Sequence, residues 1–208
     1  FSNELMFELK FLKTYLNNYL KENLNLNQRR DYWIADGIQM FLMMQYADEY
    51  FPELKMTGNV AHLKILKSYH FINLDFNQQY NYLYMLMARK NLDQPLNEPK
   101  NRLIKFNEQI ASKYRAGLSL KYLDSYLGND IVHKSIQEYI QENQFFGTNS
   151  RQFETVLVKN SPKDINWFFR TVVETRDLID YKFGKVTKTK DSISVNIINK
   201  TNTNVPIS

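Results

Sequence analysis

The sequence predicts a mainly α-helical protein that ends in a short β-hairpin. Apolar residues recur every three or four positions through most of the first 175 residues, which is the period of an amphipathic helix. Glycine and proline are scarce, with 6 and 5 copies, so few breakers interrupt these segments. From residue 182 to residue 199 the pattern changes to alternation, which is typical of β-strands.

The composition argues against several classes of function. With 14 Tyr, 14 Phe and 2 Trp the chain has the material for one sizeable core. The net charge of +5 is scattered and accompanies no nucleic-acid-binding motif, so we expect no nucleic acid as partner. The absence of cysteine excludes disulfides and thiolate metal sites. The longest apolar run, residues 40 to 44, is far too short for a membrane span.

The first two helices are the clearest. The first should cover residues 3 to 22, with Ser2 as N-cap, and its packing residues are expected to be Leu5, Phe7, Leu9, Phe11, Leu12, Leu16 and Leu20. A polar connection, residues 23 to 30, leads to the second helix. This central helix should begin at Asp31, its candidate N-cap, and stop at Pro52. Its large apolar residues form one wide stripe: Trp33, Ile34, Ile38, Phe41, Leu42, Tyr46 and Phe51.

Two residues interrupt the apolar character of this central helix. A carboxylate at Asp36, beside Trp33 and Ile34, needs a partner because burying an unpaired charge is costly. Glycine inside a helix costs about 1 kcal/mol relative to alanine. Gly37 therefore indicates a place where another backbone comes close. On residue types alone, an acid at the edge of a core helix is the simpler interpretation of Asp36.

The remaining elements are predicted from the same period and from their caps. Gly128 should end the helix that contains Tyr114, Thr148 or Ser150 should begin a later one, and Pro162 should take the first turn of the last. The expected helices cover residues 59–68, 76–90, 102–112, 113–126, 130–143, 150–159 and 161–175, and the hairpin covers residues 182–199. We divide the chain into a helical domain, residues 1–178, and a linker hairpin or start of a β-domain, residues 179–208.

The histidines and a tyrosine cluster were natural candidates for a site. His62, His70 and His133 have no histidine or acid at ligand spacing, which favours ordinary surface or core positions. A cluster of tyrosines in the segment 76–90 could line a peptide groove, although aromatic helix faces belong more often to the core.

Four segments resemble the aminopeptidase N family, the gluzincin zinc aminopeptidases. Residues 33 to 37 read Trp-Ile-Ala-Asp-Gly and are similar to the family's Trp-Leu-Asn-Glu-Gly segment, whose glutamate is the third zinc ligand. The residues from Tyr114 onward read Tyr-Arg-Ala-Gly and resemble the Tyr-x-Lys-Gly helix that carries the oxyanion-stabilising tyrosine. Residues 164 to 169 resemble the closing Trp-Phe-Phe helix, and residues 181 to 183 the start of the next β-domain. The matches span about residues 13 to 200 and imply the helical half of a thermolysin-like catalytic domain.

The same resemblance implies a degenerate zinc motif. The family carries His-Glu-x-x-His on the preceding helix, where the histidines share one face and chelate zinc while the glutamate activates water. Counting back from Asp36 by the family's spacing leads to residues 13 to 17, which read Lys-Thr-Tyr-Leu-Asn. Lys13 and Asn17 therefore stand at the lost histidine positions, Thr14 at the position of the general base, and Asp36 at the third-ligand position.

The resemblance leaves two functional interpretations from different classes. In the first, the chain is part of a metallopeptidase-like protein whose zinc site is lost. It is then a non-catalytic scaffold or peptide-binding piece with no cofactor, and Tyr114 is a vestigial oxyanion stabiliser. In the second, the chain is part of an active zinc-dependent aminopeptidase that hydrolyses N-terminal peptide bonds, with metal ligands outside this chain. Residues 13 to 17 favour the first, because a zinc enzyme needs three protein ligands. A helical interaction domain of other ancestry is the third option.

These interpretations predict which partners the protein binds and which cation pairs with Asp36. The expected partners are a peptide or protein, together with the N-terminal sheet and C-terminal β-domain of a longer chain. Without zinc, Asp36 needs another cation, because an uncompensated buried charge typically costs about 3–5 kcal/mol. We predict an ion pair between Lys13 and Asp36 with Asn17 as an added donor; the alternative is that Asp36 bonds a nearby backbone group while Lys13 reaches water. Tyr114 should point toward Asp36.

Overall fold

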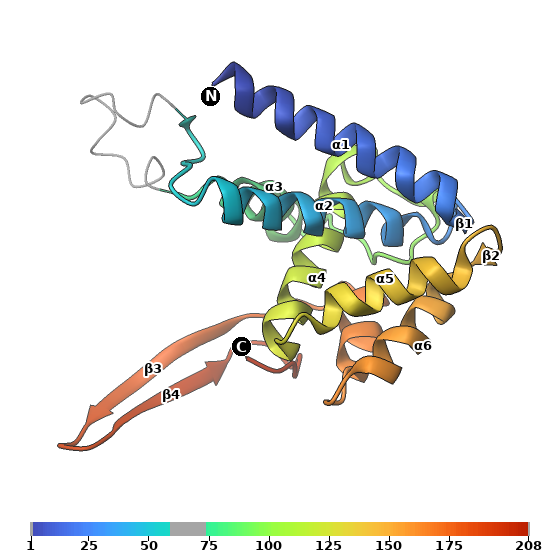
Figure 1. The fold of residues 1–208 in the computed structure, drawn as a ribbon. Helices are drawn as coiled ribbons and strands as arrows, with labels where there is room; N and C mark the ends of the chain where they lie inside the picture. Colours follow the sequence, from blue (N-terminus) through green and yellow to red (C-terminus); the bar gives the residue numbers. More distant parts are fainter. Residues whose placement is uncertain (1, 59–73, 208) are drawn as a thin grey trace.

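The computed structural model describes residues 2–58 and 74–207, and in this part the chain is mainly helical with an antiparallel hairpin at its C-terminal end (Figure 1). The predicted fold class is therefore confirmed. The α-helices are α1 Asn3–Asn23, α2 Tyr32–Tyr50, α3 Gln78–Arg89, α4 Ser112–Leu127, α5 Ile131–Asn143 and α6 Ser150–Asn160. Shorter helical segments are a 3₁₀ turn, Lys100–Arg102, and two π-helical segments, Asn107–Ala111 and Phe168–Val173. None of the helices in the described part combines the length and the apolar character needed to cross a bilayer.

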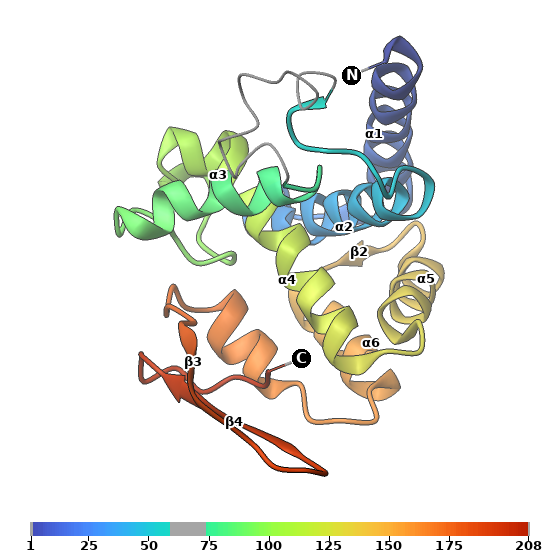
Figure 2. The same cartoon turned by 90° about the vertical axis from the view of Figure 1, so that its left-hand side faces the viewer.

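Helices α2 and α4 form the centre of the molecule. They make the most extensive contact between any two helices of the described chain, and α1, α3 and α5 pack around this pair. Figure 2 shows α4 running through the middle, with α3 on one side and α5 on the other. The two helices approach closely because Gly37 faces Ala116 and Gly117 faces Met40. The close approach expected at Gly37 is thus present.

The buried side chains form two apolar clusters on either side of this crossing. The larger one joins α2 and α4 to α5, α6 and the second π-helical segment, and its most enclosed large residues include Trp33, Phe41, Tyr139, Phe153 and Phe168. The smaller one lies between α1, α2 and α3 and contains Leu5, Leu9, Leu16, Met40, Met43, Met44, Ala47, Phe76 and Tyr80. Helix α1 is therefore held through a single apolar face.

One part of the packing prediction for α1 was wrong. Leu5, Leu9 and Leu16 are buried, but Phe7 and Phe11 are 70% and 62% exposed. Phe7 and Phe11 are four residues apart and so share a face of the helix. This face lies away from the buried leucines. The helix carries large apolar residues on two sides, and the leucine side is the one that is buried.

The caps explain several helix boundaries. The Ser2 side chain accepts a hydrogen bond from the Leu5 amide, as predicted. Asn149 caps α6 in a capping box with Gln152. Of the two predicted starts, Thr148 and Ser150, Ser150 is the first helical residue. Gly128 ends α4 with φ of +67°, a conformation that glycine adopts at little cost.

The last predicted helix was wrong at its start. Residues 161–165 form no helix, and Pro162 is not in a first helical turn. The Ser161 hydroxyl accepts a hydrogen bond from the Lys163 amide, and the Asp164 carboxylate accepts one from the Asn166 amide. These local bonds compete with helix formation, so the helical segment begins only at Asn166. The predicted helix over residues 59–68 lies outside the described residues, as do His62 and His70.

A short parallel pair joins segments far apart in sequence. Strand β1, Asn25–Leu26, pairs with β2, Gly147–Thr148. Next to it the Asp31 carboxylate accepts hydrogen bonds from the amide and the hydroxyl of Ser150, at 2.9 and 2.6 Å. Asp31 stands at the N-cap position of α2 as predicted, but its side chain makes no cap bond to α2. It bonds instead to the first residue of α6.

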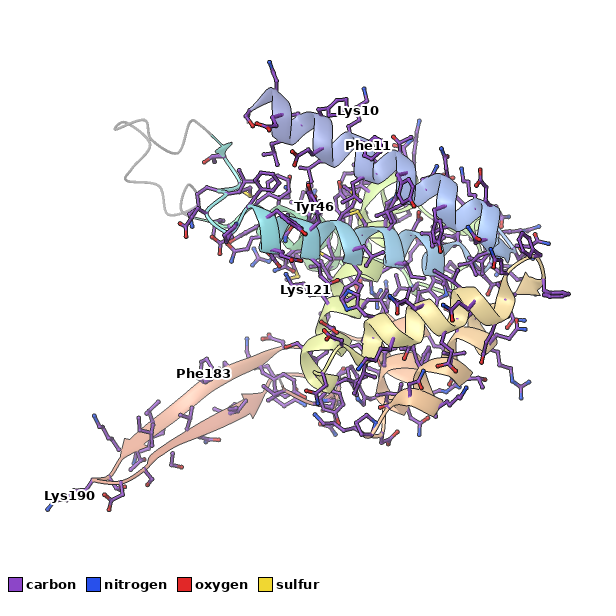
Figure 3. The ribbon with its side chains drawn as sticks, in the orientation of Figure 1. Lys10, Phe11, Tyr46, Lys121, Phe183 and Lys190 are labelled. Atoms are coloured by element: carbon purple, nitrogen blue, oxygen red, sulfur yellow. The ribbon has the colours of Figure 1, made fainter. Side chains whose placement is uncertain are left out.

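The C-terminal hairpin projects from the helical body (Figure 1). Strands β3, Tyr181–Lys188, and β4, Ile193–Asn199, pair antiparallel with an irregularity between Phe183 and Val186. Phe183 is opposite Ile197 and Val186 is opposite Val195, so these four side chains lie on one face of the ribbon. All four are exposed, and Phe183 is labelled on the ribbon in Figure 3.

Candidate functional site

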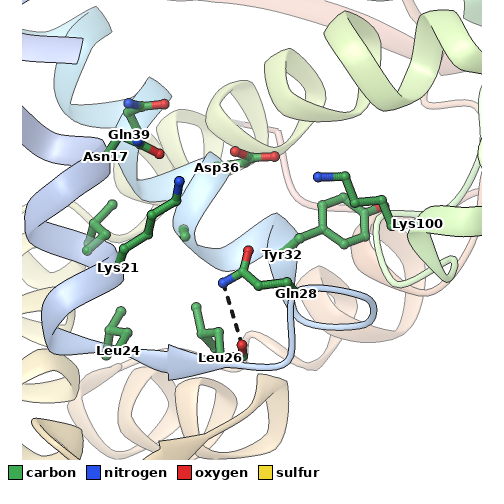
Figure 4. A pocket seen from close by; sticks show the side chains of 11 residues that line it. Asn17, Lys21, Leu24, Leu26, Gln28, Tyr32, Asp36, Gln39 and Lys100 are labelled. Atoms are coloured by element: carbon green, nitrogen blue, oxygen red, sulfur yellow. Dashed lines mark hydrogen bonds between the residues drawn. The ribbon is translucent and has the colours of Figure 1, made fainter. Parts of the chain in front are cut away.

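The crossing of α1 and α2 brings two of the five predicted site residues, Asn17 and Asp36, to one place. Lys13, Thr14 and Asn17 lie on α1, and Asp36 lies on α2. Asn17 and Asp36 line the same small hollow between the two helices (Figure 4). The hydroxyl of Thr14 does not reach it, because this exposed side chain donates to the carbonyl oxygen of Lys10 on its own helix, at 2.9 Å.

The predicted ion pair between Lys13 and Asp36 was wrong. The cation that meets Asp36 is Lys113, at the start of α4, with its Nζ atom 3.4 Å from the Asp36 carboxylate. The side chains of Lys113 and Asp36 are 19% and 31% exposed, so the pair is partly shielded from water. Lys13 is an exposed side chain, and its backbone, not its ammonium group, contributes to the site. The need of Asp36 for a counter-charge was therefore foreseen, while its source was not.

A buried glutamine extends this pair into a node that joins three helices. Gln39, which is 3% exposed, donates from Nε2 to the carbonyl oxygen of Lys13, at 2.6 Å. Its Oε1 atom accepts a hydrogen bond from Lys113. The node therefore links α1, α2 and α4. Burial lowers the pKa of Lys113, and the charge and hydrogen bond of Asp36 act in the opposite direction.

Tyr114 lies beside this node but packs elsewhere. Its ring meets the ring of Tyr80 edge to face, with centroids 4.9 Å apart. It lies against the smaller apolar cluster, and its partial burial raises its pKa. The residue of α4 that contacts Asp36 is thus Lys113, one position earlier in the chain. The role of Tyr114 as a vestigial oxyanion stabiliser stays a prediction.

The donor set at this position does not fit zinc. A zinc site takes histidine, cysteine or carboxylate ligands, three or four of them from the protein. The residues at the expected positions are a lysine, an asparagine and one carboxylate, and that carboxylate already pairs with Lys113. Within residues 2–58 and 74–207, no three side chains of His, Cys, Asp or Glu gather in a way that could hold a metal ion. His133 lies against Phe41, with ring centroids 5.2 Å apart.

The outer face of α1 carries a stack of exposed aromatic rings. Phe7, Phe11, Tyr15 and Tyr19 follow one another at every fourth position, with successive centroids 6.4, 6.3 and 6.1 Å apart. They are 70%, 62%, 54% and 39% exposed. Figure 3 shows Phe11 on α1. We call these four residues the α1 aromatic stripe. Exposed apolar patches of this kind mark interaction surfaces more often than single exposed residues do.

The tyrosines of the segment 76–90 divide between core and surface. Tyr80 is 8% exposed and belongs to the smaller apolar cluster, whereas Tyr82 is 50% exposed. Tyr84 lines a hollow of about 500 Å³ between α3, α4 and residues 177–180. The core interpretation therefore holds for Tyr80, while Tyr84 does line a cavity.

Sequence reasoning missed the residues that complete the node. Lys113 and Gln39 carry no spacing signal, because they meet Asp36 and Lys13 only through the crossing of α4, α2 and α1. The one available signal was Gly37, which marks the place where α4 comes close. Polar residues at the start of α4 were therefore candidate partners for the neighbouring Asp36. Lys21 and Lys100, which line the hollow, were likewise not singled out.

The charge pairing at Asp36 can be tested by two double-mutant cycles. Lys113→Met and Asp36→Asn should show a coupling of about 1 kcal/mol in the free energy of unfolding, because the pair is partly buried. Lys13→Met and Asp36→Asn should show a coupling below about 0.5 kcal/mol. Urea denaturation of the three single variants, the two double variants and the wild type gives both values. A larger coupling in the second cycle than in the first would contradict the assignment.

A scan against protein-family models gives no match for this chain, and a search among curated proteins gives none either.

Proposed function

We propose that this chain is a non-catalytic binding scaffold, with the helical architecture of an aminopeptidase N-like domain whose zinc site is lost. The observation that carries the proposal is the pairing of Asp36 with Lys113. The carboxylate at the third-ligand position has its counter-charge within the chain, on a side chain that also bonds Gln39. In place of a metal, the node joins α2 to α4 through a compensated charge pair, and Gln39 joins α1 to both through hydrogen bonds.

The surface of α1 supports a binding role. The α1 aromatic stripe places four rings at the surface on a helix whose other side is anchored by leucines. Aromatic side chains are enriched at protein–protein interfaces because each brings a large contact area with few rotatable bonds. The partner class that fits this surface is a protein with an apolar patch, in agreement with the peptide or protein partner expected from the sequence.

Metal content tests the loss of the zinc site. The wild-type chain, incubated with zinc and then desalted, is expected to retain no stoichiometric zinc and to leave an aminoacyl-nitroanilide substrate intact. The reason is that one paired carboxylate is too few ligands. Mass-spectrometric metal analysis and absorbance of released nitroaniline measure the two quantities. One zinc per wild-type chain would overturn the proposal.

A rebuilt variant tests the register of the resemblance. Lys13→His and Asn17→His restore the two histidines, and Lys113→Gln frees Asp36 of its counter-charge. If α1 and α2 stand as they do around a zinc ion in the family, this variant should bind about one zinc per chain. Adding Asp36→Asn should remove that zinc. A rebuilt chain that folds, by circular dichroism, and binds none would refute the assignment of residues 13 to 17.

A further inference from the structure

The hollow beside Asp36 is small, polar and open to solvent. It has a volume of about 160 Å³ and lies between α1, the segment from Leu24 to Gln28, the start of α2 and Lys100. Because one water molecule occupies about 30 Å³ in the liquid, this is room for several waters. A phosphate or carboxylate group fits such a space.

Positive charge exceeds negative charge around this hollow. Its lining contains two lysines, Lys21 and Lys100, and one carboxylate, Asp36. Figure 4 shows the ammonium groups of Lys21 and Lys100 directed into the hollow from opposite sides. The charge of Asp36 is already compensated by Lys113. The two lining lysines are therefore in excess of the local negative charge.

Nearby positive charges also act on Lys113. The positive charges of Lys13 and Lys100 both lower the pKa of Lys113, in addition to the larger effect of burial. Like charges held close together repel each other, and an anion between them would relieve this repulsion. Lys100 is held in place over the ring of Tyr32, with its Nζ atom 5.7 Å from the ring centroid.

Neutral donors complete the lining. The side-chain amides of Gln28 and Asn17 face the same space. Gln28 makes one long hydrogen bond from Nε2 to the carbonyl oxygen of Leu26, at 3.5 Å, which leaves this amide able to donate to a ligand. The hydroxyl of Tyr32 donates to the carbonyl oxygen of Glu98, at 3.1 Å, which fixes the wall of the hollow.

We propose that this hollow binds a small oxyanion, a phosphate or carboxylate group, between the ammonium groups of Lys21 and Lys100. Charge-assisted hydrogen bonds from two lysines, with amide donors beside them, are the usual means of holding such a group. Asp36 also lines the site and weakens it, because its carboxylate repels the ligand. The site goes beyond the proposed function and holds whatever the ancestry of the chain.

The test is a titration of the whole chain with inorganic phosphate, sulfate and acetate at constant ionic strength. Isothermal calorimetry or amide NMR shifts, with chloride as the reference anion, report the affinity. We expect saturable binding with one site. Preference for phosphate and sulfate assigns a tetrahedral ligand, and equal binding of acetate assigns a carboxylate group, such as a peptide C-terminus.

Variants that are expected to change the anion affinity in opposite directions make the test specific. Lys21→Met and Lys100→Met should each weaken binding about tenfold, because each removes a charged donor. Asp36→Asn should tighten binding, because it removes the repelling charge and leaves Lys113 without its pair. The matched control is Lys10→Met, which changes the net charge equally on α1 but lies roughly 16 Å further along the helix axis.

Three results would each overturn the site. The first is no phosphate, sulfate or acetate binding beyond that of chloride. The second is equal weakening by Lys10→Met and Lys21→Met, which would show only a general effect of net charge. The third is weaker anion binding in Asp36→Asn, which would mean that the carboxylate supports the site. This test is independent of the proposed function. The chain can fail to bind anions and still bind no zinc, and it can bind zinc and still bind anions.

Discussion

Arg115→Met is expected to lower the free energy of unfolding by about 3–5 kcal/mol, the largest effect of any single substitution considered for this chain. Arg115 lies in the first turn of α4. Its side chain and that of Asp93 are 6% and 4% exposed, with 3.6 Å between the guanidinium and the carboxylate. The same guanidinium donates to the carbonyl oxygens of Gln94, Val172 and Thr175. Methionine would fill similar space but leave the buried Asp93 carboxylate without its counter-charge and three carbonyls without their donor.

Lys121→Met is the matched control. It also removes a cation from α4, but its partner Asp48 and Lys121 itself are 51% and 40% exposed. Exposed pairs contribute little, so the expected loss is below about 1 kcal/mol. Urea denaturation followed by circular dichroism measures both variants. Similar losses for the two would contradict a special role for Arg115. Adding Asp93→Asn to Arg115→Met should recover part of the loss, because it removes the unpaired charge.

Gly117→Ala is expected to have the second largest effect, a net loss of about 2 kcal/mol. A Cβ atom at position 117 would lie 2.4 Å from the Cβ atom of Met40 and 3.2 Å from its carbonyl carbon. The obstacle is therefore the backbone of α2 and its first side-chain atom, which cannot rotate away. Overpacking of this kind costs about 1–3 kcal/mol or more. Alanine gains about 1 kcal/mol in helix propensity, which offsets only part of the cost.

The other glycine of the same crossing provides the comparison. A Cβ atom at Gly37 would meet Ala116 Cβ at 3.2 Å and Leu120 Cδ1 at 3.3 Å, contacts that small shifts can relieve. Gly37→Ala should therefore change stability by less than about 1 kcal/mol in either direction. The measurement is again the urea midpoint at constant slope. An equal or larger loss in Gly37→Ala than in Gly117→Ala would contradict the geometry of the α2–α4 crossing.

Local signals in the sequence predicted the helical fold well. The spacing of apolar residues located α1 and α2 to within about two residues, and Ser2 and Gly128 act as the caps that their residue types suggested. These features depend on neighbours within one or two turns, so the sequence contains the information directly. The start of the last helix was misplaced for the same kind of reason, because Ser161 and Asp164 bind their own backbone and delay it.

The site residues were predicted only where the chemistry was local. A carboxylate on an apolar helix requires a partner, and Asp36 has one. Which lysine supplies it depends on how α4 crosses α2, and no spacing along the chain reveals that. Phe7 and Phe11 were expected in the core because they are large and apolar. Their exposure depends on which side of α1 meets α2, and an apolar character on both sides leaves that choice open.

The projecting hairpin and the helical body are expected to differ in local stability, and therefore in how fast their amide protons exchange with solvent. A two-stranded ribbon is marginally stable without a packed face, and β3 and β4 keep Phe183, Val186 and Ile197 in water. Its backbone hydrogen bonds can therefore open without disturbing Leu120 or Phe41 in the core. Amide protons of the ribbon should exchange with solvent through these local openings. Amide protons of α4 should exchange only when the whole helical body unfolds.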